Sequence, residues 1–120
     1  MGKICKANGV YMRKVINNFG DVFYYNENNE YHREDGPAIE YTNGDKYWCK
    51  NGLFHREDGP AIEYSNGAKE WLRNGKHHRE DGPAIEYVDG DKKYLYNDIE
   101  YSEIKTDEEW IRFIKLMIFQ

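Results

Sequence analysis

A decapeptide with histidine, arginine and three acidic residues occurs three times, unchanged, in this chain of 120 residues. The copies have the sequence HREDGPAIEY and lie at 32–41, 55–64 and 78–87. These residue types could hold zinc or transfer protons, because imidazole and carboxylate groups do both. A single active site needs each group once and at close range, whereas every group here recurs after 23 residues.

The period favours architecture over catalysis. Stacked hairpins would separate equivalent residues by roughly 10 Å, because neighbouring strands lie about 4.8 Å apart. Zinc needs its nitrogen ligands within about 2.1 Å, so His32, His55 and His78 cannot share one ion. We therefore expect HREDGP to be a structural connector, closed by its Asp and its Gly-Pro step. Its arginine is expected to pair with acids of the same or the next connector, and we expect no catalytic residue, metal or cofactor.

The elements that position these residues are predicted to be β-hairpins. Asn43-Gly44 separates two short alternating runs, and Asn66-Gly67 and Asp89-Gly90 do the same one and two periods later. Such a step is a strong hairpin signal, and a second turn, such as Asn51-Gly52, follows each hairpin. A fixed period indicates units that bury their apolar face only against neighbours. The predicted fold is mainly β, a single-sheet solenoid of antiparallel hairpins.

One domain, 1–120, is expected to contain these units between two caps. The predicted parts are a degenerate N-terminal hairpin at 9–31, repeat units at 32–54, 55–77 and 78–100, and a helical cap at 101–120. Thr106 followed by Glu109 forms a capping box, and Trp110, Phe113, Ile114 and Met117 give the helix an apolar stripe. This helix either covers the last hairpin or binds a partner.

Two hairpin registers are consistent with the sequence. A two-residue turn pairs Ile39 with Trp48, whereas a three-residue turn pairs Glu40 with Lys46. A slip of one residue reverses which face is buried. We favour the first register, because burying aromatic area outweighs an exposed ion pair worth less than about 1 kcal/mol.

Comparison of the units separates core positions from surface positions. Those that keep their character, with one residue of the helix, are predicted to be structural: Ile39, Tyr41, Trp48, Ile62, Tyr64, Trp71, Leu72, Ile85, Tyr87, Tyr94, Leu95 and Trp110. Cys49 occupies the place of Leu72 and Leu95, so we expect a small buried hydrophobe. The partner-binding candidates are residues at positions that differ between the units and acidic residues of the third unit. They are Tyr47, Phe54, Glu70, His77, Glu86, Asp89, Asp91, Asp98 and Glu100.

The charge is acidic and unevenly distributed. The net charge is −5, and the unit at 78–100 has seven acidic residues against three basic ones. Such a surface repels phosphate backbones and attracts basic surfaces, so we expect a protein partner and no direct nucleic-acid binding. No stretch approaches the roughly 20 apolar residues of a membrane span, and the segment Met1–Asn8 lacks the apolar core of a signal peptide. Two cysteines make no disulfide framework, so we expect a cytoplasmic protein.

The pattern HREDGPAIEY, preceded in the third copy by WLRNGK at 71–76, resembles MORN-type repeats and, more closely, their HREDGPA variants. The resemblance covers residues 20–101. Those variants are similar to proteins of phages and large DNA viruses and to antitoxin-like bacterial repeat proteins. The resemblance, together with the small size, the acidity and the lack of a catalytic constellation, leads us to expect a non-enzymatic binding protein, and we expect a monomer or homodimer. Our leading expectation is an anti-CRISPR-like inhibitor that covers a basic surface of a nucleic-acid-processing defence effector in the host cytoplasm. The alternatives are an antitoxin that neutralises a toxin and a structural scaffold.

Overall fold

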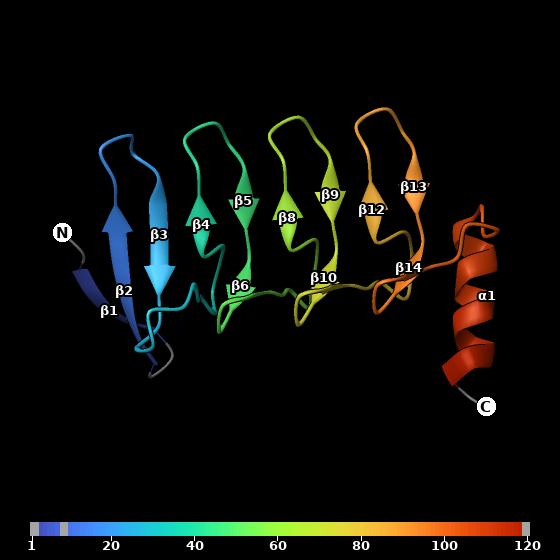
Figure 1. Cartoon of the computed structure of the whole chain (residues 1–120), viewed down its shortest axis with the longest axis horizontal. Helices are drawn as coiled ribbons and strands as arrows, with labels where there is room; N and C mark the ends of the chain where they lie inside the picture. Colours follow the sequence, from blue (N-terminus) through green and yellow to red (C-terminus); the bar gives the residue numbers. More distant parts are fainter. Residues whose placement is uncertain (1–2, 8–9, 119–120) are drawn as a thin grey trace.

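A computed structural model describes residues 3–7 and 10–118 and shows an open row of hairpins that ends in a helix (Figure 1). The molecule is thin, with extents of 49 × 33 × 18 Å. Residues 1, 2, 8, 9, 119 and 120 lie outside the described residues, which removes residue 9 from the predicted N-terminal cap and residues 119 and 120 from the predicted helical cap. The mainly β fold and the C-terminal helix are confirmed.

The strands form one large antiparallel sheet and three small ribbons. The nine-stranded sheet, in spatial order, consists of β1 (Lys3–Ala7), β2 (Val10–Ile16), β3 (Val22–Tyr25), β4 (Ile39–Glu40), β5 (Lys46–Tyr47), β8 (Ile62–Glu63), β9 (Lys69–Glu70), β12 (Ile85–Glu86) and β13 (Lys92–Lys93). The two-stranded ribbons pair β6 (Cys49–Lys50) with β7 (Leu53–Phe54), β10 (Leu72–Arg73) with β11 (Lys76–His77), and β14 (Leu95–Tyr96) with β15 (Ile99–Glu100). The prediction of a single sheet is therefore wrong, because the second turn of each unit folds its own ribbon.

The register that we favoured is also wrong. Glu40 pairs with Lys46, and Ile39 pairs with Tyr47. The same pairing recurs between β8 and β9 and between β12 and β13. Trp48 instead continues the chain toward the ribbon, where its N–H donates to the carbonyl of Ala61 in the next unit.

The turn geometry explains this register. A two-residue type I′ turn needs positive φ at both central residues, but of Asn43 and Gly44 only the glycine has it, at 102°. The N–H of Gly44 donates to the carbonyl of Tyr41, and the N–H of Tyr41 donates to the carbonyl of Asp45. The Asn43 side chain accepts the N–H of Asp45 at 2.9 Å. The result is a three-residue loop with a glycine bulge.

The same dipeptide makes a different turn in the ribbons. Asn51 and Gly52 both have positive φ, 49° and 82°, which is the two-residue type I′ geometry. The N–H of Asn51 donates to Nδ1 of His32 at 2.9 Å, and the N–H of Gly52 donates to the carbonyl of Tyr31. His55 and His78 accept the equivalent N–H groups of the next two ribbons. In each ribbon, the two-residue Asn-Gly or Asn-Asp turn is therefore accompanied by a hydrogen bond to the histidine of the preceding connector.

The core lies between the sheet and the ribbons. Ala61 and Ile62 pack on Leu72, with Tyr47 and Trp48 partly buried against them. Of the predicted structural residues, the buried ones are Ile39, Ile62, Leu72, Tyr94, Leu95 and Trp110, the half-buried ones are Tyr41, Trp48, Tyr64, Trp71 and Ile85, and Tyr87 is exposed. Cys49 is 3% exposed, and burial raises the pKa of its thiol to about 12, so it is a neutral core residue at neutral pH.

The N-terminal end of the sheet holds one strand more than we predicted. Strands β2 and β3 pair as the degenerate hairpin requires, with Lys14 opposite Tyr24. Strand β1 adds to β2, with Cys5 opposite Met12. The predicted cap at 9–31 omits β1, although the Asn8-Gly9 step between the two runs is a hairpin signal in the sequence.

Helix α1 (Asp107–Ile118) packs against the last hairpin (Figure 1). Thr106 caps it as predicted, since its Oγ1 accepts the N–H of Glu109 at 3.1 Å. Trp110 is fully buried, with its ring centroid 5.6 Å from that of Tyr94. Its Nε1 donates to the carbonyl of Arg79 at 2.8 Å, so the helix is tied both to the hairpin and to the last connector.

In residues 3–7 and 10–118, no helix has the length and apolarity that crossing a membrane requires.

Replacement of Trp110 by Ala tests the importance of this helix for stability. Because the ring is fully buried, we expect W110A to lower the free energy of unfolding by about 3–5 kcal/mol. The matched control is L116A on the same helix, where Leu116 is 66% exposed and the loss should stay within about 0.5 kcal/mol. Urea denaturation followed by circular dichroism measures both. Equal losses in the two variants would show that the helix does not pack as described.

Candidate functional site

The arginine of each connector lies over an aromatic ring of the preceding hairpin. The distances from the guanidinium carbon to the ring centroid are 4.1 Å for Arg33 and Tyr24, 3.9 Å for Arg56 and Trp48, and 3.9 Å for Arg79 and Trp71. A cation within about 6 Å of a ring face is attracted by the quadrupole of the ring. Each arginine thus joins its own unit to the unit before it.

Hydrogen bonds within the connector hold this guanidinium in place. Arg56 Nε donates to Asp58 at 3.1 Å, and its Nη1 donates to the carbonyl of Pro60 at 3.1 Å and to Glu63 at 3.0 Å. A Cβ atom on Gly59 would lie 2.9 Å from the guanidinium carbon, so glycine leaves the space that the arginine fills. The predicted pairing of arginine with acids is therefore found, and it lies within one unit.

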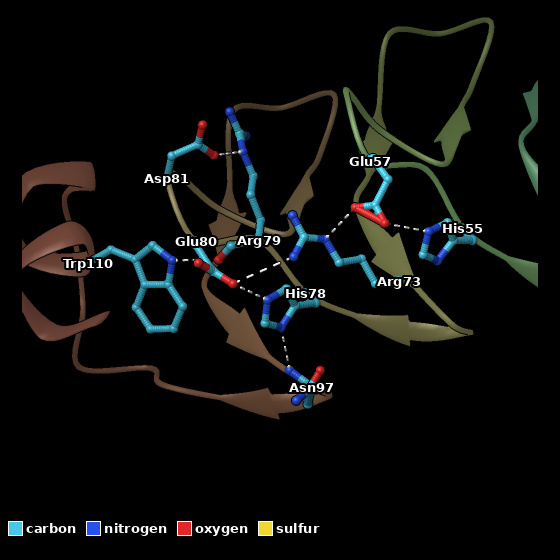
Figure 2. A network of polar contacts seen from close by, with 9 residues as sticks. All are labelled: His55, Glu57, Arg73, His78, Arg79, Glu80, Asp81, Asn97 and Trp110. Carbon is cyan, nitrogen blue, oxygen red and sulfur yellow. Dashed lines mark hydrogen bonds and ion pairs between the residues drawn. The ribbon is translucent and has the colours of Figure 1, made fainter. Parts of the chain in front are cut away.

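The connector histidines use both ring nitrogens inside the chain. Nδ1 of His78 accepts the N–H of Asn97 at 3.2 Å, and its Nε2 lies 3.0 Å from Glu80 (Figure 2). His55 has the same two contacts, with Asn74 and Glu57. Since Nδ1 accepts, Nε2 must carry the proton that is shared with the glutamate. Both ring nitrogens of His55 and His78 therefore have partners within the chain.

Neighbouring connectors are joined by one further arginine. Arg73 of β10 lies between Glu57 and Glu80, with nitrogen–oxygen distances of 3.6 Å to each (Figure 2). Among the residues that the structure describes, no three His, Cys, Asp or Glu side chains are placed to hold a metal ion. The polar groups of neighbouring connectors are therefore linked through Arg73.

The positions that differ between units change in pairs. Tyr47 of β5 packs on Phe54 of β7, with ring centroids 5.8 Å apart. In the next unit these places hold Glu70 and His77, which form an ion pair or hydrogen bond at 2.5 Å. The third unit has Lys93 and Glu100 there, which are again complementary and line the same surface groove. An aromatic pair thus alternates with charged pairs at one structural position.

The polar pair of the second unit extends into a short network. Tyr64 donates its hydroxyl proton to Glu70, and the backbone N–H of His77 donates to Asp98 at 2.7 Å. Burial raises the pKa of Tyr64, and the hydrogen bond to Glu70 and the negative charge of that carboxylate add to the rise. Glu70, His77 and Asp98 are therefore occupied with one another.

The structure brings only some of the partner-binding candidates together. Tyr47 and Glu70 both pair with Ile62 across the sheet, and their partners Phe54 and His77 lie beside them. We call the surface formed by positions 47, 54, 70, 77, 93 and 100 the variable face. Glu86 forms an ion pair with Arg79 at 3.2 Å instead.

The acids of the third unit do not form one patch. Asp89 and Asp91 lie in the turn between β12 and β13, whereas Asp98 lies in the turn between β14 and β15 at the opposite end of the unit (Figure 1). Asp91 and Glu100 line one groove of about 420 Å³, but three lysines line it as well. The local charge of this groove is therefore nearly balanced.

Sequence reasoning missed an aromatic surface that continues from the variable face toward the N-terminus. Seven rings form it, and we call it the aromatic strip: Phe23, Tyr25, Tyr31, Tyr41, Tyr47, Phe54 and Tyr64. Phe23 and Tyr31 precede Tyr47 and Phe54 by about one period. Aligning the degenerate hairpin with the first unit would therefore have indicated that Phe23 and Tyr31 belong to the same surface as Tyr47 and Phe54.

The connector arginine can be tested by two substitutions at one position. We expect R56A to lower the free energy of unfolding by about 2–3 kcal/mol, because it removes the contact with Trp48 and several charge-assisted hydrogen bonds. R56K should lose about half as much, since lysine lacks the planar fork of donors. Arg112, exposed on α1, provides the control R112A, with a change within about 0.5 kcal/mol. Chemical denaturation that finds R56K as stable as the original chain would contradict this role.

The paired character of the variable positions predicts a compensating exchange. E70K alone should lower the free energy of unfolding by about 1 kcal/mol, because it breaks the bonds to His77 and Tyr64. The double variant E70K/H77E reproduces the pair found at positions 93 and 100 and should recover most of this loss. Thermal denaturation of the two single variants and the double variant gives the coupling. Additive effects would show that the two positions are independent.

Comparison of the chain with known protein families, with curated proteins and with solved structures finds no match.

Proposed function

We propose that the chain is a solenoid of 23-residue hairpin units, of the HREDGPA variant of MORN-type repeats, and that it is a non-enzymatic protein-binding protein. The repeated architecture is supported by equivalent pairings one period apart: Ile39 with Tyr47, Ile62 with Glu70, and Ile85 with Lys93. The connector contacts of arginine and histidine recur at the same interval.

One observation carries the functional part of the proposal. The invariant polar groups are held in contacts inside the chain, whereas the groups that differ between units lie on the variable face with partly exposed rings. Phe54 is 38% exposed, and its chain neighbour Leu53 is 49% exposed. Tyr31, one period before Phe54, is also 38% exposed. Aromatic residues supply much contact area with few rotatable bonds, which makes them frequent energetic centres of interfaces.

We propose further that the partner is a host antiviral defence effector with a basic nucleic-acid-binding surface, and that the protein inhibits it in the host cytoplasm by covering that surface. The net charge of −5 favours encounter with such a surface. The thin, elongated shape, 49 Å in its longest extent, suits occlusion of a channel. Antitoxin activity is the alternative that the same surface would serve.

A plating experiment tests this function. The protein is produced in bacteria that carry a CRISPR effector or another nucleic-acid-targeting defence system, and a targeted phage is plated on them. We expect plating to rise toward the level of defence-free cells and the purified effector to elute in complex with the protein. The variant Y47E/F54H, which places the pair of the second unit in the first, should fold and lose the effect.

K50A, which removes an exposed lysine from β6, is the control and should protect the phage fully. Absence of protection and of complex formation over a panel of such defence systems would overturn the proposal. Rescue of cells from a co-expressed toxin in that case would support the antitoxin alternative.

A further inference from the structure

The aromatic strip is a continuous path of rings across four hairpins. Neighbouring ring centroids lie 5.1 to 6.5 Å apart, from Tyr25 and Tyr31 at one end to Tyr47 and Tyr64 at the other. Most of the contacts are edge-to-face, such as that of Tyr41 with Tyr47 at 79°. Such packing leaves ring faces or edges at the surface, and every ring of the strip is half-buried or exposed.

Carboxylates border this strip. Asp45 lies in the turn next to Tyr47, and Glu70 accepts the hydroxyl proton of Tyr64. Burial is the main cause that raises the pKa of Tyr47, and the negative charges of Asp45 and Glu70 contribute to it. Burial likewise raises the pKa of Tyr41, with contributions from Tyr31, Asp21 and Asp45. Carboxylates therefore make the surroundings of Tyr41, Tyr47 and Tyr64 more negative.

A ring face in a negative potential attracts cations, and a planar cation also stacks on it. The chain itself supplies one example on the strip, since the guanidinium carbon of Arg13 lies 4.8 Å from the ring centroid of Tyr25. Over the other six rings of the strip, the described part of the chain places no lysine or arginine. The part of these rings that is exposed therefore has no cation of the described chain over it.

We propose that the aromatic strip binds arginine side chains of a protein partner, with the guanidinium group over the rings of Tyr41, Tyr47 and Phe54. This deepens the proposed function and depends on it for the partner, a basic protein surface. Arginine is favoured over lysine because its flat, weakly hydrated head loses less on leaving water. Nucleic-acid bases also stack on rings, but the phosphates that carry them are repelled by the net charge of −5.

The probe is N-acetyl-arginine methylamide, titrated into the full chain while the aromatic side-chain signals are followed by NMR. We expect saturable shifts that are largest for Tyr41, Tyr47 and Phe54. N-acetyl-lysine methylamide should bind about two- to fivefold more weakly. The variant Y47E/F54H should lose the response while its thermal stability shows that it is folded, and F54L is the milder substitute if the double variant unfolds.

Several outcomes would overturn the proposal. These are the absence of ring shifts, equal affinity for the arginine and lysine probes, and an unchanged response in Y47E/F54H. Ring shifts that change on dilution without any probe would also count against it, because a second copy of the chain would then occupy the strip. The plating experiment separates the two proposals: arginine binding without inhibition refutes the defence function alone, and inhibition that survives Y47E/F54H refutes the strip alone.

Discussion

The structure depends on the contact between one arginine in each connector and an aromatic ring in the preceding hairpin. Two-residue strands have too few hydrogen bonds to be stable alone, so the units must be fixed to one another by side chains. The guanidinium group makes both halves of this link. It lies over the ring of Trp48 or Trp71 in the preceding unit, and it donates to Asp, Glu and a proline carbonyl of its own unit. The connector sequence HREDGP provides the arginine, its acceptors and the space that it fills.

This constraint separates scaffold from surface. The polar residues of HREDGP make the same contacts in successive units, which suits a decapeptide that is unchanged in all three copies. Positions 47 and 54, like 70 and 77 after them, contact each other and need only match each other. They have diverged as pairs, from Tyr and Phe to Glu and His and then to Lys and Glu. The face that they form is therefore free to acquire a binding specificity.

At the C-terminal end Trp110 packs on Tyr94, the ring at the position where the earlier units receive an arginine.

Much of the architecture could be predicted from the sequence, and the failures have physical causes. The hairpins and the capped helix follow from local signals such as Asn-Gly steps and Thr106. The register could not be predicted, because the dipeptide Asn-Gly forms a three-residue loop in the large sheet and a two-residue turn in the ribbons. Which of the two turns forms involves contacts with residues 19 positions away, as between His32 and Asn51. Trp48 and Trp71 are only half-buried, because the arginines of the next connectors, and not apolar side chains alone, lie against their rings. The aromatic strip was missed because its rings come from two turns of each unit, which only the folded chain brings together.

The central claim is that the connector arginines lie over the rings of the preceding hairpins. Protons held above an aromatic ring experience its ring current, so the most direct measurement is the NMR chemical shift of the δ-methylene protons of Arg56 and Arg79. The account predicts that both are shifted upfield from their random-coil positions and that W48L removes the shift of Arg56 alone. Random-coil shifts for both arginines in the folded protein would contradict it.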